Sequence, residues 1–247
     1  MQRIIGAALA TCVAGAAQAQ DVGYEIEGEA FEGYFAAAEA PRALVLVIHD
    51  WDGLDDYERE RADMIAALGY DAFAVDLFGA GERPETMEAR QAATGALYGD
   101  RERMRALIEG GLAEAREHSG AGEAVVIGYC FGGAAALELA RSGEEEVAGY
   151  VSFHGGLATP EGQSWPDEAP PLLILHGGAD ENPSMLDLAT FADEVEAAGL
   201  TYDIEVYAGA PHAFTVFGSE RYQERADMRS WAAFERFLEE TLGGEES

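Results

Sequence analysis

The sequence contains no lysine. Its 15 basic residues are all arginines, and 47 acidic residues outnumber them, so the 247-residue chain carries a net charge of −32 at pH 7. A field of this sign repels nucleic acids and anionic membrane surfaces, which argues against both as partners. The excess of acid fits a protein kept soluble in a salty medium, and a solvated acidic surface is its simplest interpretation.

Cysteine is scarce as well, and Cys12 and Cys130 are the two in the chain. Residues 1–19 combine one arginine, a short run of small apolar residues and an Ala-Gln-Ala ending, which is typical of a secretory signal peptide. We expect cleavage after Ala19 and export to the periplasm or the medium. Loss of the arginine takes the net charge from −32 to −33. Attachment as a lipoprotein through Cys12 is the less favoured alternative, because the preceding Thr11 fits such a cleavage site poorly.

Removal of Cys12 makes Cys130 the only cysteine of the exported chain. No intramolecular disulfide can then form, although export usually leads to an oxidising compartment. A lone thiol in that setting is either buried and inert or present for its chemistry.

Long apolar runs and metal-binding patterns are also missing. No run approaches the roughly 20 apolar residues of a membrane-spanning helix. The five histidines show no metal-ligand spacing, and the glycines form neither a dinucleotide-binding motif nor a phosphate loop. We therefore expect neither a metal nor a cofactor.

What the sequence does contain is an alternation of short apolar strands and amphipathic helices. We expect an antiparallel hairpin over 24–38. Further strands are expected at 43–49, 70–78, 124–128, 147–153, 171–177 and 203–207. Helices are expected at 55–68, within 85–118 (two, separated near Gly99), and at 131–141, 183–198 and 219–242. This pattern predicts a mostly parallel sheet with helices on both faces. Residues 155–170 indicate a surface loop, and no composition break or repeat divides residues 20–247, so we predict a single α/β domain.

The segment Gly-Tyr-Cys-Phe-Gly (128–132) lies where an apolar strand passes into an Ala-rich helix. The pattern G-x-C-x-G matches a nucleophile elbow with sulfur in place of the serine oxygen. Glycines at 128 and 132 fit this pattern, because side chains there would collide with the neighbouring strand and helix. The positive N-terminal end of the helix favours the thiolate form of Cys130. A small buried cysteine beside a tight turn is the alternative interpretation of the motif taken alone.

Two later residues extend the pattern. Asp180 follows the strand at 171–177, and His212 follows the strand at 203–207. The order nucleophile, acid, base is that of α/β-hydrolases, whose sites form at the carboxyl ends of strands. We predict that His212 is oriented by Asp180 and takes the proton of Cys130. Taken singly, Asp180 fits an acid near a helix start and His212 fits an ordinary loop histidine.

Five segments, VIHDWDGL, DLFGAG, GYCFGG, HGGAD and GAPHAF, resemble the dienelactone hydrolase family of α/β-hydrolases over roughly residues 24–242. The resemblance implies a catalytic triad of Cys130, Asp180 and His212. It also implies an oxyanion hole made by the backbone N–H groups of Phe131 and Trp51. Two such donors contribute about 3 kcal/mol each to catalysis.

The chain departs from the resembled family at two positions. Asp50 stands where the family usually has a glutamate thought to switch the cysteine between thiol and thiolate, so Asp50 is a candidate modulator that is one methylene shorter. Val216 stands where the best-known members have an arginine that holds the substrate carboxylate. Arg90 is a candidate replacement cation. Because of Val216, we expect an ordinary ester rather than a carboxylate-bearing lactone.

Other residues are candidates for the walls of a substrate pocket, although each fits the core equally well. These candidates are Trp51, Phe78, Arg90, Tyr129, His154 and Phe214. His49 and His176 end strands, and we expect both to be packing histidines with satisfied hydrogen bonds.

The sequence thus predicts a hydrolase that cleaves a carboxylic ester or enol lactone through an acyl-cysteine intermediate. Because a thiolate is also a good leaving group, activated substrates such as enol lactones, aryl esters or thioesters are favoured. Two alternatives stay open. One is a thioesterase or general carboxylesterase on the same three residues, and the other is a non-catalytic binding protein or a redox-responsive thiol. The expected partner is a small-molecule ester or lactone, and the sequence leaves its identity and the oligomeric state open.

Overall fold

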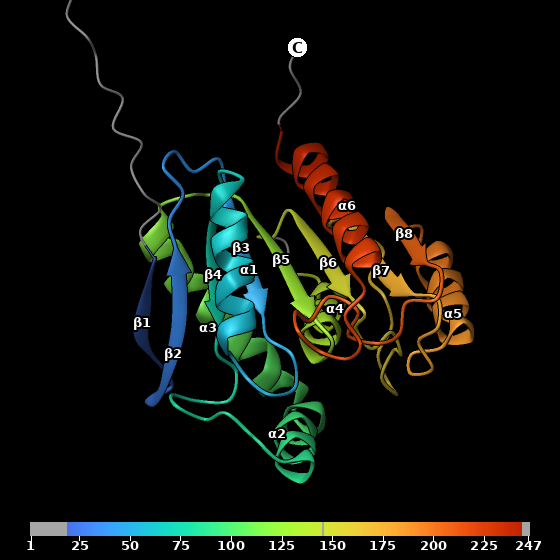
Figure 1. The fold of residues 1–247 in the computed structure, drawn as a ribbon, viewed down its shortest axis with the longest axis horizontal. Helices are drawn as coiled ribbons and strands as arrows, with labels where there is room; N and C mark the ends of the chain where they lie inside the picture. Colours follow the sequence, from blue (N-terminus) through green and yellow to red (C-terminus); the bar gives the residue numbers. More distant parts are fainter. Residues whose placement is uncertain (1–18, 145, 244–247) are drawn as a thin grey trace, which may run out of the picture.

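The computed structural model describes residues 19–144 and 146–243. The predicted leader, with Cys12, therefore lies outside the described residues except for Ala19. Within these residues eight strands form one sheet in the order β1-β2-β4-β3-β5-β6-β7-β8 (Figure 1). The strands are β1 (Ala19–Ile26), β2 (Glu29–Ala36), β3 (Leu44–Ile48), β4 (Asp71–Val75), β5 (Ala124–Tyr129), β6 (Gly149–Phe153), β7 (Leu172–Gly177) and β8 (Tyr202–Tyr207).

The first two strands form an antiparallel hairpin, and β2 also pairs antiparallel with β4. From β4 to β8 all neighbours are parallel. Parallel strands buried on both faces have continuous apolar sequences. In β3 all five residues are buried, with Leu44, Leu46 and Ile48 in one core cluster and Val45 and Val47 in the other.

Six helices accompany the sheet in the described part of the chain. They are α1 (Asp56–Ala67), α2 (Met87–Gly99), α3 (Arg101–Ser119), α4 (Phe131–Ser142), α5 (Met185–Ala197) and α6 (Glu224–Leu242). Side chains of α1 and α6 pack into one core cluster, and those of α3, α4 and α5 pack into the other, so helices cover both faces of the sheet (Figure 1). None of these helices is both long and apolar enough to cross a membrane.

The predicted α/β architecture is confirmed, and two boundaries need correction. The hairpin begins at Ala19 rather than residue 24, because residues 19–23 pair with residues 32–36 of β2. The last helix begins at Glu224, not near Ser219. Residues before it form a turn, in which the Tyr222 N–H donates to the Ser219 carbonyl at 3.2 Å and the Gln223 N–H donates to the Phe214 carbonyl at 3.0 Å. These bonds give the backbone an alternative to the helix ladder.

The sheet also determines where a site can form. After β3 the chain continues to β4 on one side, whereas β5 pairs on the other side of β3. Ligand crevices of open α/β sheets lie outside the carboxyl ends of strands at such a reversal. The loop after β3, with Asp50 and Trp51, and the residue after β5, Cys130, meet there.

Candidate active site

Cys130 lies on a sharp turn between β5 and α4. Its backbone has φ 52° and ψ −107°, a left-handed conformation that is costly for a residue with a side chain. The adjacent glycines are required by close contacts. A Cβ on Gly128 would lie 2.1 Å from the Gly132 carbonyl oxygen, and a Cβ on Gly132 would lie 2.2 Å from the Ile48 oxygen. The turn therefore presents the cysteine as the sequence pattern predicted.

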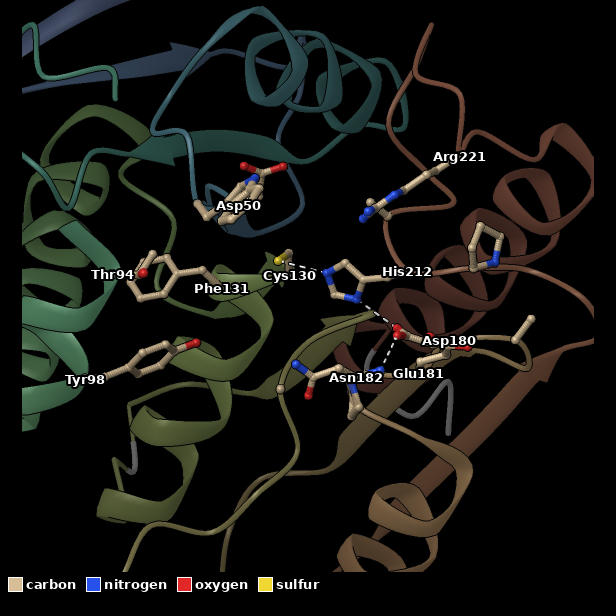
Figure 2. Close-up of a pocket in the computed structure, with 16 residues that line it drawn as sticks. Asp50, Thr94, Tyr98, Cys130, Phe131, Asp180, Glu181, Asn182, His212 and Arg221 are labelled. Atoms are coloured by element: carbon tan, nitrogen blue, oxygen red, sulfur yellow. Dashed lines mark hydrogen bonds and ion pairs between the residues drawn. The ribbon is translucent and has the colours of Figure 1, made fainter. Parts of the chain in front are cut away.

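The three residues singled out from the sequence come together across 82 positions of the chain (Figure 2). Nε2 of His212 lies 3.0 Å from Sγ of Cys130, and Nδ1 lies 2.8 Å from Oδ2 of Asp180. The other carboxylate oxygen of Asp180 accepts the N–H of Asn182 at 2.9 Å. Because Nδ1–H donates to the acid, Nε2 is left as an acceptor that faces the sulfur. The arrangement can pass a proton from thiol to imidazole.

The surroundings of Cys130 favour the thiol over the thiolate. Burial raises the pKa of the Cys130 thiol well above its ordinary value, and the nearby Asp50 carboxyl adds to the shift. The hydrogen bond from the Phe131 N–H lowers this pKa but is outweighed. The sequence-based expectation of a thiolate counted the helix end and missed the burial. A thiol in this state needs a neighbouring base to become nucleophilic, and Nε2 of His212 lies within reach of it.

Phe131 and Trp51, the two residues expected to supply oxyanion-hole donors, both line the cavity that contains the sulfur. Phe131 is the first residue of α4, so its N–H has no acceptor within the helix. Trp51 lies in the loop after β3. The N–H groups of its two neighbours, Asp50 and Asp52, already donate to carboxyl oxygens of the protein. Glu58 Oε1 accepts the Asp50 N–H at 3.3 Å, and Asp50 Oδ1 accepts the Asp52 N–H at 3.0 Å.

A cavity of about 750 Å³ opens over these groups, a size suited to small-molecule ligands. Figure 2 shows Thr94 and Tyr98 of α2 on one side of the space around Cys130, and His212 and Arg221 on the other. The residues that line it are Asp50, Trp51, Thr94, Tyr98, Cys130, Phe131, Gly156, Ala179, Asp180, Glu181, Asn182, Pro183, Pro211, His212, Ala213 and Arg221. Over residues 19–144 and 146–243, no three His, Cys, Asp or Glu side chains are grouped so as to hold a metal ion.

Comparison with known families agrees with this geometry. The model of the dienelactone hydrolase family matches residues 31–242. The chain belongs to the dienelactone hydrolase family. Its assignment to the α/β-hydrolase fold and to the carboxylic ester hydrolases is thereby confirmed.

Relatives of this dienelactone hydrolase family member include both solved structures and sequences. A dienelactone hydrolase-like promiscuous phosphotriesterase from metagenomic libraries superposes with a TM-score of 0.82 at 29% identity, over 92% of this chain and 99% of that one. A probable 2-oxo-3-(5-oxofuran-2-ylidene)propanoate lactonase of Bradyrhizobium sp is 25% identical over 76% of this chain and 79% of its own length. A putative carboxymethylenebutenolidase of Saccharolobus solfataricus is 23% identical over 89% and 97%.

Asp50, at the family's usual glutamate position, lines the cavity as a neutral acid. Burial raises the pKa of its carboxyl to about 10, and the neighbouring Asp52 and Glu58 add to the shift. Asp52 in turn lies 3.3 Å from the Arg90 guanidinium. Arg90 also stacks over the Trp51 ring at 5.4 Å, so it supports the loop after β3 and does not itself line the cavity.

Four other residues predicted for the pocket walls are likewise absent from the described lining. Tyr129, Phe214 and His154 are fully buried in the core below the site, and Phe78 packs against the His49 ring at 4.5 Å. The aromatic walls are Trp51, Phe131 and Tyr98. The sequence placed these residues near the ends of strands or in the following loops, and it does not say which side chains there face the cavity and which face the core.

The two strand-end histidines differ from each other. His49 is fully buried and accepts the Leu77 N–H at Nε2 (3.1 Å), with Nδ1 2.6 Å from the Asp50 carbonyl, and burial lowers its pKa to about 4. It is the packing histidine that was expected. His176 is buried too, but its Nε2 has no partner among the described residues.

Several lining residues were not found from the sequence. Thr94 and Tyr98 come from α2, which no motif connects with the site. Arg221 lies nine positions after His212 in the same loop. The sequence feature that could have identified Arg221 is an arginine close to the predicted catalytic histidine in a chain that has few basic residues.

Proposed function

We propose that the protein hydrolyses carboxylic esters or lactones through an acyl-cysteine intermediate on Cys130. The observation that carries the proposal is the position of His212, whose ring lies 3.0 Å from the sulfur and 2.8 Å from the Asp180 carboxylate. A base within hydrogen-bond reach of a nucleophile, itself oriented by an acid, is the requirement for nucleophilic acyl transfer.

In the first half of the proposed reaction, His212 Nε2 takes the thiol proton as Sγ attacks the acyl carbon. The carbonyl oxygen becomes an oxyanion held by the N–H groups of Phe131 and Trp51, which contribute about 3 kcal/mol each. Collapse of this intermediate breaks the carbon–oxygen bond of the ester, and the alcohol leaves with the proton from His212. In the second half, His212 takes a proton from water, which attacks the thioester and releases the acid and the free thiol.

The raised pKa of the Cys130 thiol limits the range of substrates. Because the pKa of the partly buried thiol is raised, the sulfur becomes nucleophilic as His212 takes its proton, and as a thiolate it is also a good leaving group. Esters with good leaving groups, such as aryl and enol esters, are therefore the preferred class.

The test is stopped-flow hydrolysis of p-nitrophenyl acetate by the wild type and by Cys130→Ala, with intact mass spectrometry of the quenched mixture. We expect a burst of p-nitrophenol and one acetyl group on the wild type, both missing from the variant. Equal rates in the two proteins without an adduct would overturn the proposal.

We further propose that the substrate carries an anionic group that binds Arg221. Among the described residues that line the cavity, Arg221 is the one arginine, and its guanidinium points into the space beside His212 (Figure 2). The Bradyrhizobium relative is named for a lactone that bears a carboxylate. Val216, the position that argued against such a substrate, packs against the core and is not part of the cavity lining.

This proposal is tested with p-nitrophenyl hemisuccinate and p-nitrophenyl butyrate, which differ by a terminal carboxylate. Arg221→Met should lower kcat/KM for the hemisuccinate by about 10- to 100-fold, the effect of a hydrogen-bonded ionic contact, and leave the butyrate unchanged. Arg225→Met, an exposed arginine on the first turn of α6, is the control. If the ratio of kcat/KM for the hemisuccinate to kcat/KM for the butyrate is the same in wild type and Arg221→Met, the proposal of an anionic substrate is refuted.

We also propose that residues 1–19 are a cleaved export signal. Removing them takes away a single residue of β1, Ala19, whose partner in the hairpin is Ala36. Expression of the full chain in a bacterial host, followed by intact mass measurement of the periplasmic fraction, should give a chain that begins at Gln20. A mass that retains Met1, found in the cytoplasm, would contradict export.

A further inference from the structure

Arg61 of α1 is among the largest fully buried side chains and takes no part in the chemistry proposed above. It is 1% exposed. Its guanidinium forms an ion pair with Asp227 of α6, and Nη2 also donates to the backbone carbonyl of Thr215 at 2.8 Å. A buried guanidinium is tolerated only where acceptors meet its charge, so this position is defined by its partners.

Four aromatic rings surround the same guanidinium. Its central carbon lies 4.2–5.7 Å from the ring centroids of Phe217, Trp231, Tyr57 and Tyr129. Contacts of a guanidinium with aromatic faces at these distances are attractive and restrict its orientation. Arg61 is therefore a rigid attachment point between α1, α6 and the loop that joins β8 to α6.

That loop carries His212. Directly after the histidine, Ala213 has a left-handed φ of 59°, and Phe214 and Thr215 are then fully buried. Both the backbone carbonyl and the side-chain hydroxyl of Thr215 form hydrogen bonds. Its carbonyl accepts from Arg61, and its hydroxyl lies 2.7 Å from the Tyr57 hydroxyl and 2.8 Å from Nε2 of His154.

His154 connects this anchor to the His212 ring. It follows β6 with a left-handed φ of 43°, and it is 1% exposed. Its ring lies edge-on to the His212 ring, with centroids 5.3 Å apart, and edge-on to the Phe214 ring at 5.3 Å. Burial lowers the pKa of His154 well below its ordinary value, and the nearby His212 and Arg61 lower it further, so it packs as a neutral ring. A neutral ring can support His212 without opposing the positive charge that His212 gains.

We propose that Arg61 is a positioning residue that, through Thr215 and His154, holds the His212 ring where it reaches both Asp180 and Cys130. The side chain of His212 is about a quarter exposed, and its direct bonds are those to the acid and the sulfur. Without the anchor, the ring can tilt about these two contacts. Because a misplacement of about 1 Å can cost a hundredfold in rate, small loop movements decide whether proton transfer occurs.

The proposal rests on the proposed function, and the experiment separates the two. Thr215→Val removes the hydroxyl contacts and keeps the backbone carbonyl for Arg61, whereas Arg61→Met removes the anchor itself. The control is Arg105→Met on α3, which breaks an ion pair of 2.5 Å to the buried Glu138 far from the loop.

Three quantities are measured on each folded variant: the acetylation rate of Cys130 by p-nitrophenyl acetate, its pH profile, and the low-field NMR signal of the His212 Nδ1 proton. The titratable groups around His212 whose charge enters the profile are Cys130, Asp180, His154, His176 and Arg221.

We expect Thr215→Val to acetylate about tenfold more slowly with KM nearly unchanged, and Arg61→Met to lose more. The pH profile should change and the Nδ1 signal should broaden, because the bond from His212 to Asp180 is loosened. The Arg105→Met control should be less stable than the wild type but should keep the wild-type acetylation rate, pH profile and Nδ1 signal.

If Thr215→Val acetylates at the wild-type rate with an unchanged profile and signal, the positioning role is refuted. The same conclusion follows if both anchor variants behave like the Arg105 control. If the wild type itself acquires no acetyl group on Cys130, the proposed function fails, and the NMR signal still reports whether the anchor orders His212.

Discussion

Gly132→Ala is the substitution whose cost the structure determines most directly. Gly132 lies in the first turn of α4, where alanine would ordinarily stabilise the helix by about 1 kcal/mol. Here the added Cβ would lie 2.2 Å from the carbonyl oxygen of Ile48 and 2.6 Å from that of His49. Both are backbone atoms at the end of a buried strand, so neither can rotate away.

The end of β3 must move by about 1 Å to restore an ordinary contact. Forcing an extra methyl group into a packed core costs about 1–3 kcal/mol, and the rigid neighbours here place the cost at the upper end. After subtraction of the helix gain, the free energy of unfolding should fall by about 2 kcal/mol. For a chain of this size that lowers Tm by about 4–8 °C. Activity should fall as well, since the displaced strand leads into the loop of Trp51.

The assay is thermal unfolding followed by circular dichroism, with Gly95→Ala as the matched control. Gly95 lies inside α2, and a Cβ there would meet no atom within 4 Å. This control should gain up to about 1 kcal/mol, or about 2–4 °C. A Gly132→Ala protein that melts at or above the wild-type temperature would refute the contact argument.

Two further predictions concern the carboxyl groups of the site. Asp180→Asn should lower kcat for p-nitrophenyl acetate by roughly a thousandfold or more, because the amide cannot hold His212 in the tautomer that faces Cys130. Asp193→Asn, the same change at an exposed position of α5 outside the cavity lining, should change kcat less than about twofold, and similar losses in both would count against the triad. For Asp50, burial raises the folded-state pKa to about 10, so the wild type loses stability as pH rises from about 4 through about 10. Asp50→Asn should therefore gain stability relative to the wild type between about pH 5 and about pH 8 in urea unfolding, and a constant difference would show that Asp50 is already ionised.

The strands and the elbow were predictable because their causes are local. Apolar runs such as 44–48 are short and continuous, which is the pattern of a strand covered on both faces. The glycines at 128 and 132 lie two positions to either side of Cys130, whose turn they permit. The start of α6 was placed too early because the turn at 219–223 is held by Phe214, a contact that helical periodicity does not contain.

The walls and electrostatics of the site were not predictable in the same way. The assignment of Tyr129 and Phe214 to the pocket required knowing which way each side chain faces, and both pack into the core cluster that α1 and α6 cover. The contribution of Tyr98 depends on where α2 lies against the sheet. Electrostatics followed burial too, since burial raises the pKa of both the Cys130 thiol and the Asp50 carboxyl.

The sequence by itself determined the candidate triad and its order, because Cys130, Asp180 and His212 each follow a strand and the carboxyl ends of parallel strands lie at the same edge of the sheet. Only the tertiary structure decided how that chemistry is controlled. Arg61, Thr215 and His154 are separated by up to 154 positions, yet they meet behind His212. Arg221 and Tyr98 likewise face one cavity from opposite sides. Burial, protonation and orientation depend on what packs around a group, and residues distant in the chain supply that packing.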